Sequence, residues 1–370
     1  MPGPIGNLAG YIRDFIVVPD QLACVIAAWV AASHLCAEWE RFPHLGVTSP
    51  EKRSGKTKLL QVLEPVLPNP FNASNISAAA IWRMIEDTSL SLMIDEAQHL
   101  KRGGSESSQV ISELLNSAID RDAIVIRCVG QEHTPTPFHI YCPKIVACIG
   151  ELDGVLADRC LPIGLSRKTD EDKVRRCFSR DFKPYGLKKR GELQKWLSEK
   201  KNEIVRVYKT INPFDIENDR LAELLMPLQA MLTVGGGEFG IRALEGYAVE
   251  LDRRDNEPEK QSPGVMLLAA CRELLQHRDS FVPTWQLISE LANREEEPWG
   301  TYSRGNLITP EALALLLSPY KIKSKHTPQR DARGYYAADF ADAWKRYLPA
   351  QNNPSDSSTP SNSSRNGGEA

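Results

Sequence analysis

Between residues 46 and 168, short apolar runs alternate with segments whose apolar positions recur at helical spacing. The runs are almost continuous in apolar residues, which is typical of strands buried on both faces of a parallel sheet. Alternation of such strands with helices is the mark of an α/β fold. The pattern predicts strands at His44–Thr48, Leu90–Ile94 and Lys144–Ile149, and helices at Ser77–Asp87 and Gln109–Ile119.

A β-hairpin is predicted directly before the strand Lys144–Ile149. Ala123–Val129 and Phe138–Tyr141 are rich in β-forming residues, and Gly130–Pro135 between them is rich in residues that favour turns. The two runs are therefore expected to pair with each other and to lead into the next strand of the sheet.

Helical periodicity dominates between residues 169 and 252. The predicted helices there are Leu193–Ile211, Asp219–Leu232 and Phe239–Leu251. Residues 253–263 are polar, carry Pro258 and end in Pro263, which predicts a linker. The segment 349–370 is dominated by Ser, Asn, Pro and Gly and is expected to be disordered.

Residues 264–348 contain three short predicted helices, then two short predicted strands and a closing helix, which predicts a winged-helix-like domain. Thr309 is the expected N-cap of the third helix of this domain. The predicted helices are Val265–His277, Trp285–Ala292, Pro310–Leu317 and Phe340–Tyr347, and the wing strands are Tyr320–Ser324 and Gly334–Tyr336.

Residues 1–45 are expected to form an N-terminal helical segment that leads into the first strand. Gln21–Ala37 contains no formal charge over seventeen residues, which raises the alternative of a membrane span. The stretch is short for a span of about 20 apolar residues, and it contains polar Ser33 and His34. No basic region of a secretion signal accompanies it. A buried helix is therefore predicted, with no membrane partner.

Composition changes this picture little. The chain of 370 residues is 42% apolar and 25% charged, with a net charge of −3, which fits a globular protein of about two or three domains. Any attraction to nucleic acid would have to come from local patches. The 8 cysteines include no C-x-x-C pair, so reduced thiols in a cytoplasmic protein are expected.

The chemistry of the chain is concentrated in Ser49–Thr57, which ends in Gly-Lys-Thr. A loop that enters a helix points unpaired backbone N–H groups and the positive end of a dipole at an anion. Gly55 lets the backbone approach phosphates, Lys56 would reach their oxygens, and the Thr57 hydroxyl would bind Mg²⁺. The predicted nucleotide-binding residues of this loop are Ser54, Gly55, Lys56, Thr57 and Lys58.

Two acidic residues, Asp95 and Glu96, follow the predicted strand Leu90–Ile94. Parallel strands place ligands beyond their carboxyl ends. Asp95 is expected to hold the metal ion, and Glu96 to polarise the attacking water. ATP and Mg²⁺ are therefore the predicted cofactors.

One position departs from the usual phosphate-binding pattern, which has Gly six residues before the lysine. Pro50 occupies that position, and proline removes one N–H from the loop. Two alternatives follow: a chance Gly-Lys-Thr in a surface loop, and a nucleotide binder that no longer hydrolyses. The intact Asp95–Glu96 pair favours hydrolysis.

Several arginines are candidates for contacts with the nucleotide. Arg159, between a short predicted helix and a strand, fits an arginine finger that reaches the γ-phosphate in a neighbouring subunit. Arg167 and Lys168 are the second choice, and Arg242, after a run of glycines, suits a lid arginine. The alternatives are a surface Asp158–Arg159 pair and a solvated helix charge at Arg242.

A local basic excess lies in the predicted wing. Between Ser318 and Tyr336 the excess is +4, in a chain that is negative overall. Such an excess is what contact with DNA phosphates requires, and the alternative is a solvated hairpin of a protein–protein module. The predicted DNA-binding residues are Lys321, Lys323, Lys325, Arg330 and Arg333, together with His133 at the hairpin tip.

Two histidines, His99 and His133, have both a functional and a purely structural interpretation. His99 follows the acidic pair and could lie near the γ-phosphate, but a capping or packing role is the more common one. His133 could contact DNA in the pore of a ring, and a plain turn residue is its alternative.

These motifs resemble an uncharacterised ATPase family of phages and mobile elements, a branch of the AAA+ and superfamily-3-like helicases that is often fused behind a TOPRIM-type primase. The resemblance spans about residues 10–348. It rests on SPEKRSGKTKLLQVLEPVL, LMIDEAQHL, LLNSAIDRDAIVIRCVG, CPKIVACIGELDGVLADRCLPIGLSRK, MPLQAMLTVGGGEFGIRA, EEEPWG and RGYYAADFADAWKRYL. It implies Lys56, Thr57, Asp95 and Glu96 as the ATPase core, Arg159 as the finger and the hairpin as a pore element.

Two departures from this family stand out. No Asn or Thr lies at the usual polar sensor position around Cys148–Gly150. No primase segment is expected ahead of the ATPase, so priming activity is not carried over. Pro50 is compatible with the family's own form of the loop.

The resulting prediction is an AAA+-like P-loop NTPase core at 46–168, a helical lid at 169–252 and a winged helix at 264–348. The expected function is that of a Mg²⁺-ATP-hydrolysing, helicase-like DNA motor of phage or mobile-element replication. The expected assembly is a hexamer-like ring, with a separate primase or replication protein as a further partner. The alternatives are a DNA-binding ATPase switch that does not unwind DNA, and a winged-helix binding protein with an inert nucleotide fold.

Overall fold

The computed structural model describes residues 3–73, 84–85, 90–97, 113–129, 134–152, 154–255, 262–278, 280–294, 297–303, 305–327 and 332–348. It divides into two units, Met1–Arg253 and Arg254–Ala370. Most of the predicted helix Ser77–Asp87, the hairpin tip at 130–133 and the tail at 349–370 lie outside the described residues, as does His99.

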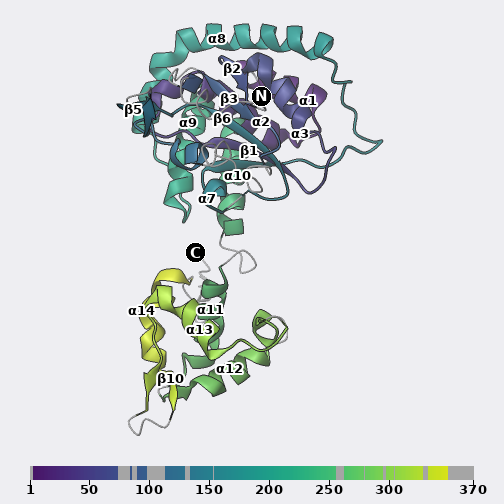
Figure 1. Cartoon of the computed structure of the whole chain (residues 1–370). Coiled ribbons are helices and arrows are strands. Elements are labelled where there is room, and N and C mark those ends of the chain that lie inside the picture. Colours follow the sequence, from purple (N-terminus) through teal and green to yellow (C-terminus); the bar gives the residue numbers. More distant parts are fainter. Residues whose placement is uncertain are drawn as a thin grey trace, which may run out of the picture. The chain divides into compact units, whose positions relative to one another are not determined.

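A five-stranded sheet forms the centre of the first unit (Figure 1). Its strands pair in parallel, and the strand order is β2-β3-β6-β1-β7. The predicted α/β class with a parallel sheet is confirmed, whereas the short strand β2 was not predicted. The strands are β1 (His44–Ser49), β2 (Pro70–Asn72), β3 (Ser91–Ile94), β6 (Lys144–Ile149) and β7 (Cys160–Gly164).

Both faces of this sheet are covered, which explains why its strands read as continuous apolar runs. Successive side chains of β6 point to opposite faces. Ile145 and Ala147 join the larger core, with the N-terminal helices and the helices after β7. Val146 and Cys148 join a smaller core with Leu114 and neighbouring residues.

The N-terminal helices are α1 (Pro4–Phe15) and α2 (Asp20–Ser33). Every residue of α2 from Ala23 to Ser33 is buried, so the uncharged stretch is a core helix, as predicted. Trp29 from this helix donates a hydrogen bond of 2.9 Å to the carbonyl of Pro43. Across the part of the chain that is described, no helix has the length and apolar character that crossing a membrane requires.

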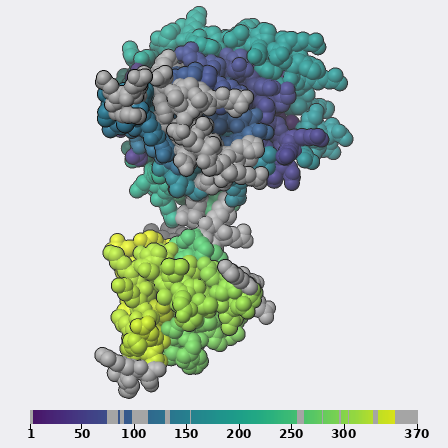
Figure 2. Space-filling model, viewed as in Figure 1, coloured from purple at the N-terminus to yellow at the C-terminus, as the bar shows by residue number. Residues whose placement is uncertain are grey.

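Helices follow the sheet, as predicted, but the first is longer than expected. The three are α8 (Ser179–Thr210), α9 (Asp219–Gly235) and α10 (Gly237–Asp255). The predicted start at Leu193 was wrong because Pro184 and Gly186 read as helix breakers. Gly186 is needed for packing, since a Cβ there would come within 2.6 Å of Pro65 and of the Tyr11 hydroxyl. Figures 1 and 2 show α8, in teal, along the outside of the unit.

The predicted hairpin is present as a separate two-stranded sheet of β4 (Ile124–Val129) and β5 (Thr134–His139). The second strand begins earlier than predicted, because the predicted turn ended at Pro135 and the predicted strand began only at Phe138, whereas β5 contains Pro135 and Pro137. Prolines two positions apart place their nitrogens on the same side of a strand, so the pairing with β4 survives through the residues between them.

The second unit combines short helices with a three-stranded antiparallel sheet of order β8-β10-β9. Its core includes Trp299 and Phe340, both fully buried. The four predicted helices are present: α11 (Pro263–Leu275), α12 (Thr284–Ala292), α13 (Pro310–Leu317) and α14 (Ala341–Tyr347). The strands are β8 (Val282–Pro283), β9 (Lys325–His326) and β10 (Arg333–Tyr335).

Local chemistry accounts for one success and one error in this unit. Thr309 caps α13, and its hydroxyl accepts a hydrogen bond of 3.2 Å from the amide of Ala312, as predicted. The predicted strand Tyr320–Ser324 was wrong. Ser318–Tyr320 forms a 3₁₀ turn, and Lys321 follows it in the left-handed region at φ 63°, which delays the strand to Lys325.

Candidate functional site

The carboxyl ends of β1 and β3 lie at the same edge of the parallel sheet, separated by β6. The loop 50–55 leaves β1 at this edge and enters α3 (Lys56–Leu63), while Asp95 and Glu96 directly follow β3. The strands β6, β3 and β2 lie on one side of β1 and β7 on the other, so the order reverses at β1. Ligands of open α/β sheets bind at such a point.

The loop folds around the carbonyl of Glu51. The hydroxyls of Ser49 and Ser54 donate hydrogen bonds of 2.7 and 2.9 Å to this oxygen. Gly55 has a φ of 91° and precedes α3, whose first turn has no side-chain cap. Because a Cβ at Gly55 would meet nothing within 4 Å, its backbone conformation is what requires glycine. The first amides of α3 therefore stay available for an anion.

Lys56 places a buried ammonium group beside this loop. The residue is only 9% exposed. Its Nζ donates to the hydroxyl of Ser49 and lies 3.4 Å from the carbonyl oxygen of Glu51, and both groups are neutral. Within the described ranges, Lys56 forms no ion pair. These two contacts occupy at most two of the three N–H donors of the ammonium group, one of them weakly, so Lys56 can donate to an anion beside the loop.

A second buried lysine, Lys144, has an acceptor for each N–H of its ammonium group. The Nζ of Lys144 contacts three carbonyl oxygens, those of Ile140 at 2.9 Å, Cys142 at 3.0 Å and Ala118 at 3.5 Å. It begins β6, at the amino edge of the sheet, and is fully buried. Three carbonyls thus match the three N–H donors of Lys144, whereas Lys56 has one hydroxyl and one carbonyl at 3.4 Å.

Thr57 and Asp95 bring two oxygen ligands together. The Thr57 hydroxyl donates a hydrogen bond of 2.8 Å to Oδ2 of Asp95, and Oδ1 of Asp95 accepts one of 2.9 Å from the amide of Glu96. Glu96 is exposed and has a φ of 56°. One hydroxyl and one carboxylate suit Mg²⁺, which typically binds one or two protein oxygens together with substrate phosphates and water.

No cluster of three or more His, Cys, Asp or Glu side chains suited to a metal occurs among the residues with described positions. A metal ion at Thr57 and Asp95 would accordingly need further ligands from a bound molecule. The donor set thus fits a metal–phosphate complex better than a bare ion.

The other predicted residues of the loop have different surroundings. Ser54 is 6% exposed and is fixed by its bond to Glu51. The Lys58 side chain is exposed, and its Nζ donates a 3.0 Å hydrogen bond to Gln61. Cys148 occupies the expected sensor position, and its thiol lies 3.7 Å from the carbonyl of Gly150. A thiol is a weaker polar group than Asn or Thr.

Arg159 is not brought to this edge. It precedes β7, and its carbonyl accepts a 2.9 Å hydrogen bond from the amide of His44, the first residue of β1. Arg159 therefore lies at the amino edge of the sheet, opposite the loop of the same chain. Its guanidinium donates to the carbonyl of Val155, and burial lowers its pKa.

Arg167 lies at the loop. It follows β7 at the carboxyl edge, and its Nε donates a 3.1 Å hydrogen bond to the carbonyl of Lys52. The prediction ranked Arg167 second as a residue reaching a neighbouring subunit, whereas the structure places it against its own loop. Its position just beyond the end of a parallel strand was the available signal.

Arg242 lies on α10, is exposed, and pairs with Glu238 one turn earlier on the same helix. Among the described contacts, none links Arg242 to the loop 50–57. The predicted role of Arg242, a lid contact with bound nucleotide, stays a prediction.

The predicted DNA-binding residues lie mainly in the second unit. Lys321 and Lys323 are exposed at the turn before β9. Lys325 pairs with Asp339 at 2.5 Å, and Arg333 donates a 2.9 Å hydrogen bond to His326. The pair with Asp339 reduces the basic excess that the sequence shows. His133 and Arg330 lie outside the described residues.

Comparison with known proteins gives three findings. The family model DUF3631, described as a protein of unknown function, matches residues 164–347. An "uncharacterized 28.9 kDa protein in xis 5′region" of Saccharopolyspora erythraea is 32% identical over 134 residues, which are 35% of this chain and 50% of that protein. This chain thus spans half the length of the curated relative that it matches.

The third finding is a solved structure described as the A form apo structure of the NrS-1 C-terminal region. It is similar with a TM-score of 0.44 and 11% identity, over 91% of this chain and 75% of that one. The family match begins at the end of β7 and covers the helices and the second unit, so Lys56, Thr57 and Asp95 lie outside the matched range.

Proposed function

We propose that this chain is an AAA+-like P-loop NTPase that hydrolyses ATP with Mg²⁺ and acts as a helicase-like DNA motor. The observation that carries the proposal is the buried ammonium of Lys56, which has a donor left over beside the uncapped first turn of α3. A triphosphate would accept hydrogen bonds from both.

The residues at the carboxyl edge of the sheet would have different roles in ATP hydrolysis. Lys56 and the amides around Gly55 would bind and orient the phosphates, while Thr57 and Asp95 would hold Mg²⁺. The ion would neutralise charge on the phosphate oxygens. Glu96, exposed beside Asp95, would orient the attacking water and accept its proton.

The DNA-binding part of the proposal rests on the second unit. Its helices and three-stranded antiparallel sheet support a winged-helix domain, with β9 and β10 as the wing. Exposed Lys321 and Lys323 would contact phosphates, and Lys325 would contribute less because Asp339 already pairs with it. The setting we propose is phage or mobile-element replication, as in the family that the sequence resembles.

The proposal includes a hexamer-like ring with active sites between subunits. Arg159 cannot serve the loop of its own chain from the amino edge of the sheet, so a finger role requires a neighbouring subunit. The exposed hairpin of β4 and β5 would face the pore. A separate primase or replication protein would act with this ring.

Calorimetric titration of purified protein with Mg-ATP tests the core of the proposal. Wild-type protein should bind ATP and hydrolyse it, and Lys56→Ala should abolish both. Lys188→Ala, which removes an exposed lysine of α8, is the matched control and should behave as wild type. Absence of ATP binding by folded wild-type protein would refute the proposal.

A second experiment separates the motor from a DNA-binding ATPase switch. A forked duplex with single-stranded tails is incubated with protein and Mg-ATP. Strand separation that requires ATP and is lost in Lys56→Ala supports the motor. DNA-stimulated ATP turnover without strand separation would replace the motor with the switch.

A further inference from the structure

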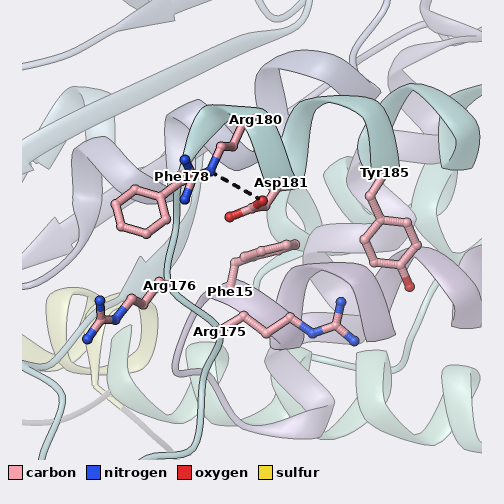
Figure 3. Close-up of a pocket in the computed structure, with 7 residues that line it drawn as sticks. All are labelled: Phe15, Arg175, Arg176, Phe178, Arg180, Asp181 and Tyr185. Atoms are coloured by element: carbon pink, nitrogen blue, oxygen red, sulfur yellow. Dashed lines mark ion pairs between the residues drawn. The ribbon is translucent and has the colours of Figure 1, made fainter.

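An open pocket of about 630 Å³ lies at the start of α8. Figure 3 shows its lining: Phe178 and Arg176 on one side, Tyr185 on the other, and Phe15 between them. The pocket combines aromatic rings with arginines. Its lining residues are Phe15, Arg175, Arg176, Phe178, Arg180, Asp181 and Tyr185.

The packing of α8 on α3 relates this pocket to the start of α3, which follows the loop 50–55. The Tyr11 hydroxyl donates a 2.9 Å hydrogen bond to the carbonyl of Val62 and lies 3.2 Å from that of Phe182. Lys183 and Glu64 form an ion pair of 3.4 Å next to this point. Residue numbers therefore increase in the same direction along α3 and α8 at this contact.

One helical turn closer to the N-terminus, Lys58 takes the place of Val62 on α3, and Phe178 takes the place of Phe182 at the start of α8. Burial raises the pKa of the Cys177 thiol and the charge of Lys58 opposes this, which agrees with a place for Cys177 and Phe178 near the first turn of α3. The chain reaches Phe178 after passing the loop itself, where Arg167 bonds to the carbonyl of Lys52. The segment that ends at the pocket thus starts at the loop 50–55.

Most charges of the pocket are already matched. Arg175 pairs with Asp14 at 3.5 Å and lies over the Tyr185 ring at 5.9 Å. Arg180 pairs with Asp181 at 3.8 Å and lies over the Phe178 ring at 5.2 Å.

Arg176 is different, because its guanidinium has no ion pair among the residues that the structure describes, and its side chain is exposed. The Phe178 ring is 46% exposed. Together they offer an aromatic face and an uncommitted cation.

We propose that this pocket receives the base and ribose of the nucleotide whose phosphates lie at the loop. Phe178 stacks on the base, and Arg176 contacts the ribose or the α-phosphate. The inference rests on the proposed function and adds the residues that recognise the nucleoside. The volume is within the usual range for a small-molecule site, about 300–1,000 Å³.

The lining also predicts the specificity. Asp181 and two of the three arginines of the lining already form ion pairs, which leaves them less able to read the edge of a base. Recognition by stacking depends on the area of the ring system, so purines should bind better than pyrimidines. ATP and GTP should bind with similar affinity, and CTP and UTP more weakly.

The test compares ATP with inorganic tripolyphosphate, which has the phosphates and lacks the nucleoside. Titrations are run with Mg²⁺ on wild type, Phe178→Ala and Lys56→Ala. Phe178→Ala should weaken ATP binding by about 5- to 100-fold and leave tripolyphosphate binding unchanged. Lys56→Ala should weaken both. Phe178→Trp should restore ATP affinity, because it restores the aromatic face.

Matched controls exist for both residues. Phe239→Ala removes a ring of nearly equal exposure, 47%, at the start of α10. Arg206→Gln removes an exposed arginine of α8 and is compared with Arg176→Gln. Both controls should bind ATP as wild type does.

The outcomes separate the two proposals. If wild type binds neither ATP nor tripolyphosphate, the proposed function fails and this inference fails with it. If wild type binds ATP but Phe178→Ala binds it equally well, the inference alone is wrong. Loss of single-stranded DNA binding in Phe178→Ala with unchanged ATP affinity would also overturn it, and would assign the pocket to a DNA strand.

Discussion

Thr57 and Asp95 are 38 positions apart in sequence, yet the Thr57 hydroxyl donates a 2.8 Å hydrogen bond to Oδ2 of Asp95. Their strands are not neighbours, because β6 lies between β1 and β3. The contact forms because the loop after β1 extends across the end of β6 and starts α3 next to the acidic pair. Two oxygens that can share one metal ion are thus placed together by the sheet.

Thr57→Val should lose the proposed Mg²⁺ site. Valine keeps the shape of threonine and removes the hydroxyl, so Mg²⁺-dependent ATP affinity should fall by at least about tenfold. Binding measured without Mg²⁺ should change little. Thr57→Ser retains the hydroxyl and is the control. Equal affinity of the Val and Ser variants with Mg²⁺ would remove Thr57 from the metal site.

Glu96→Gln should separate binding from hydrolysis. Glutamine cannot accept a proton from water, so turnover should fall by about 10²- to 10⁴-fold while ATP binding persists. Phosphate release and calorimetry measure the two quantities on the same preparation. Wild-type turnover in this variant would mean that another group activates the water.

Arg159→Ala mixed with Lys56→Ala should regain activity that neither variant has alone. Each parent lacks one half of a site shared between subunits, and a mixed ring contains some complete sites. Loss of an arginine finger typically costs about 10³- to 10⁵-fold in rate, so a small recovery is detectable. ATP turnover is followed across mixing ratios. A mixture that never exceeds its parents would contradict a role for Arg159 across an interface.

Neutralising Lys321 and Lys323 should lower the salt dependence of DNA binding. Each lost phosphate contact reduces the slope of log affinity against log salt by about 0.9 on duplex DNA. Lys325→Ala should change the slope less, because Asp339 already pairs with Lys325. Fluorescence anisotropy at several salt concentrations gives the slopes. Unchanged slopes in the double variant would mean that this turn does not contact DNA.

His34 should make the first unit less stable in mild acid. Burial lowers its pKa to about 4 from the ordinary 6.5, and its Nε2 donates a 2.8 Å hydrogen bond to the carbonyl of Val66. The folded state therefore binds fewer protons than the unfolded state between these values. Stability is complete above about pH 6.5 and falls as the pH drops toward 4, by up to about 3 kcal/mol.

Urea unfolding of wild type and His34→Gln at pH 7 and pH 5 measures this effect. The variant should lose less stability between the two pH values than wild type. Buried His44, whose pKa is lowered well below its ordinary value by burial, acts in the same direction and leaves part of the dependence in place. Identical losses in both proteins would show that His34 does not titrate as argued.

The elements that the sequence predicts correctly are those whose structure is set by residues close to them in the sequence. The strands at His44 and Lys144, the buried helix of α2 and the cap at Thr309 all follow from local periodicity or a single side chain. The errors lie where distant packing overrides local preference. Gly186 reads as a helix breaker, but it lies inside α8 because Pro65 and Tyr11 approach it closely.

The sequence by itself determined the chemical types at the candidate site: a glycine before a helix, a lysine, a hydroxyl and an acidic pair after an apolar strand. Only the tertiary structure decided which of them meet. It placed Arg167 at the loop and Arg159 at the opposite edge, and matched Lys325 with Asp339. The reason is physical: periodicity is a property of adjacent residues, whereas strand order and helix register are set by which apolar faces pack together across the whole unit.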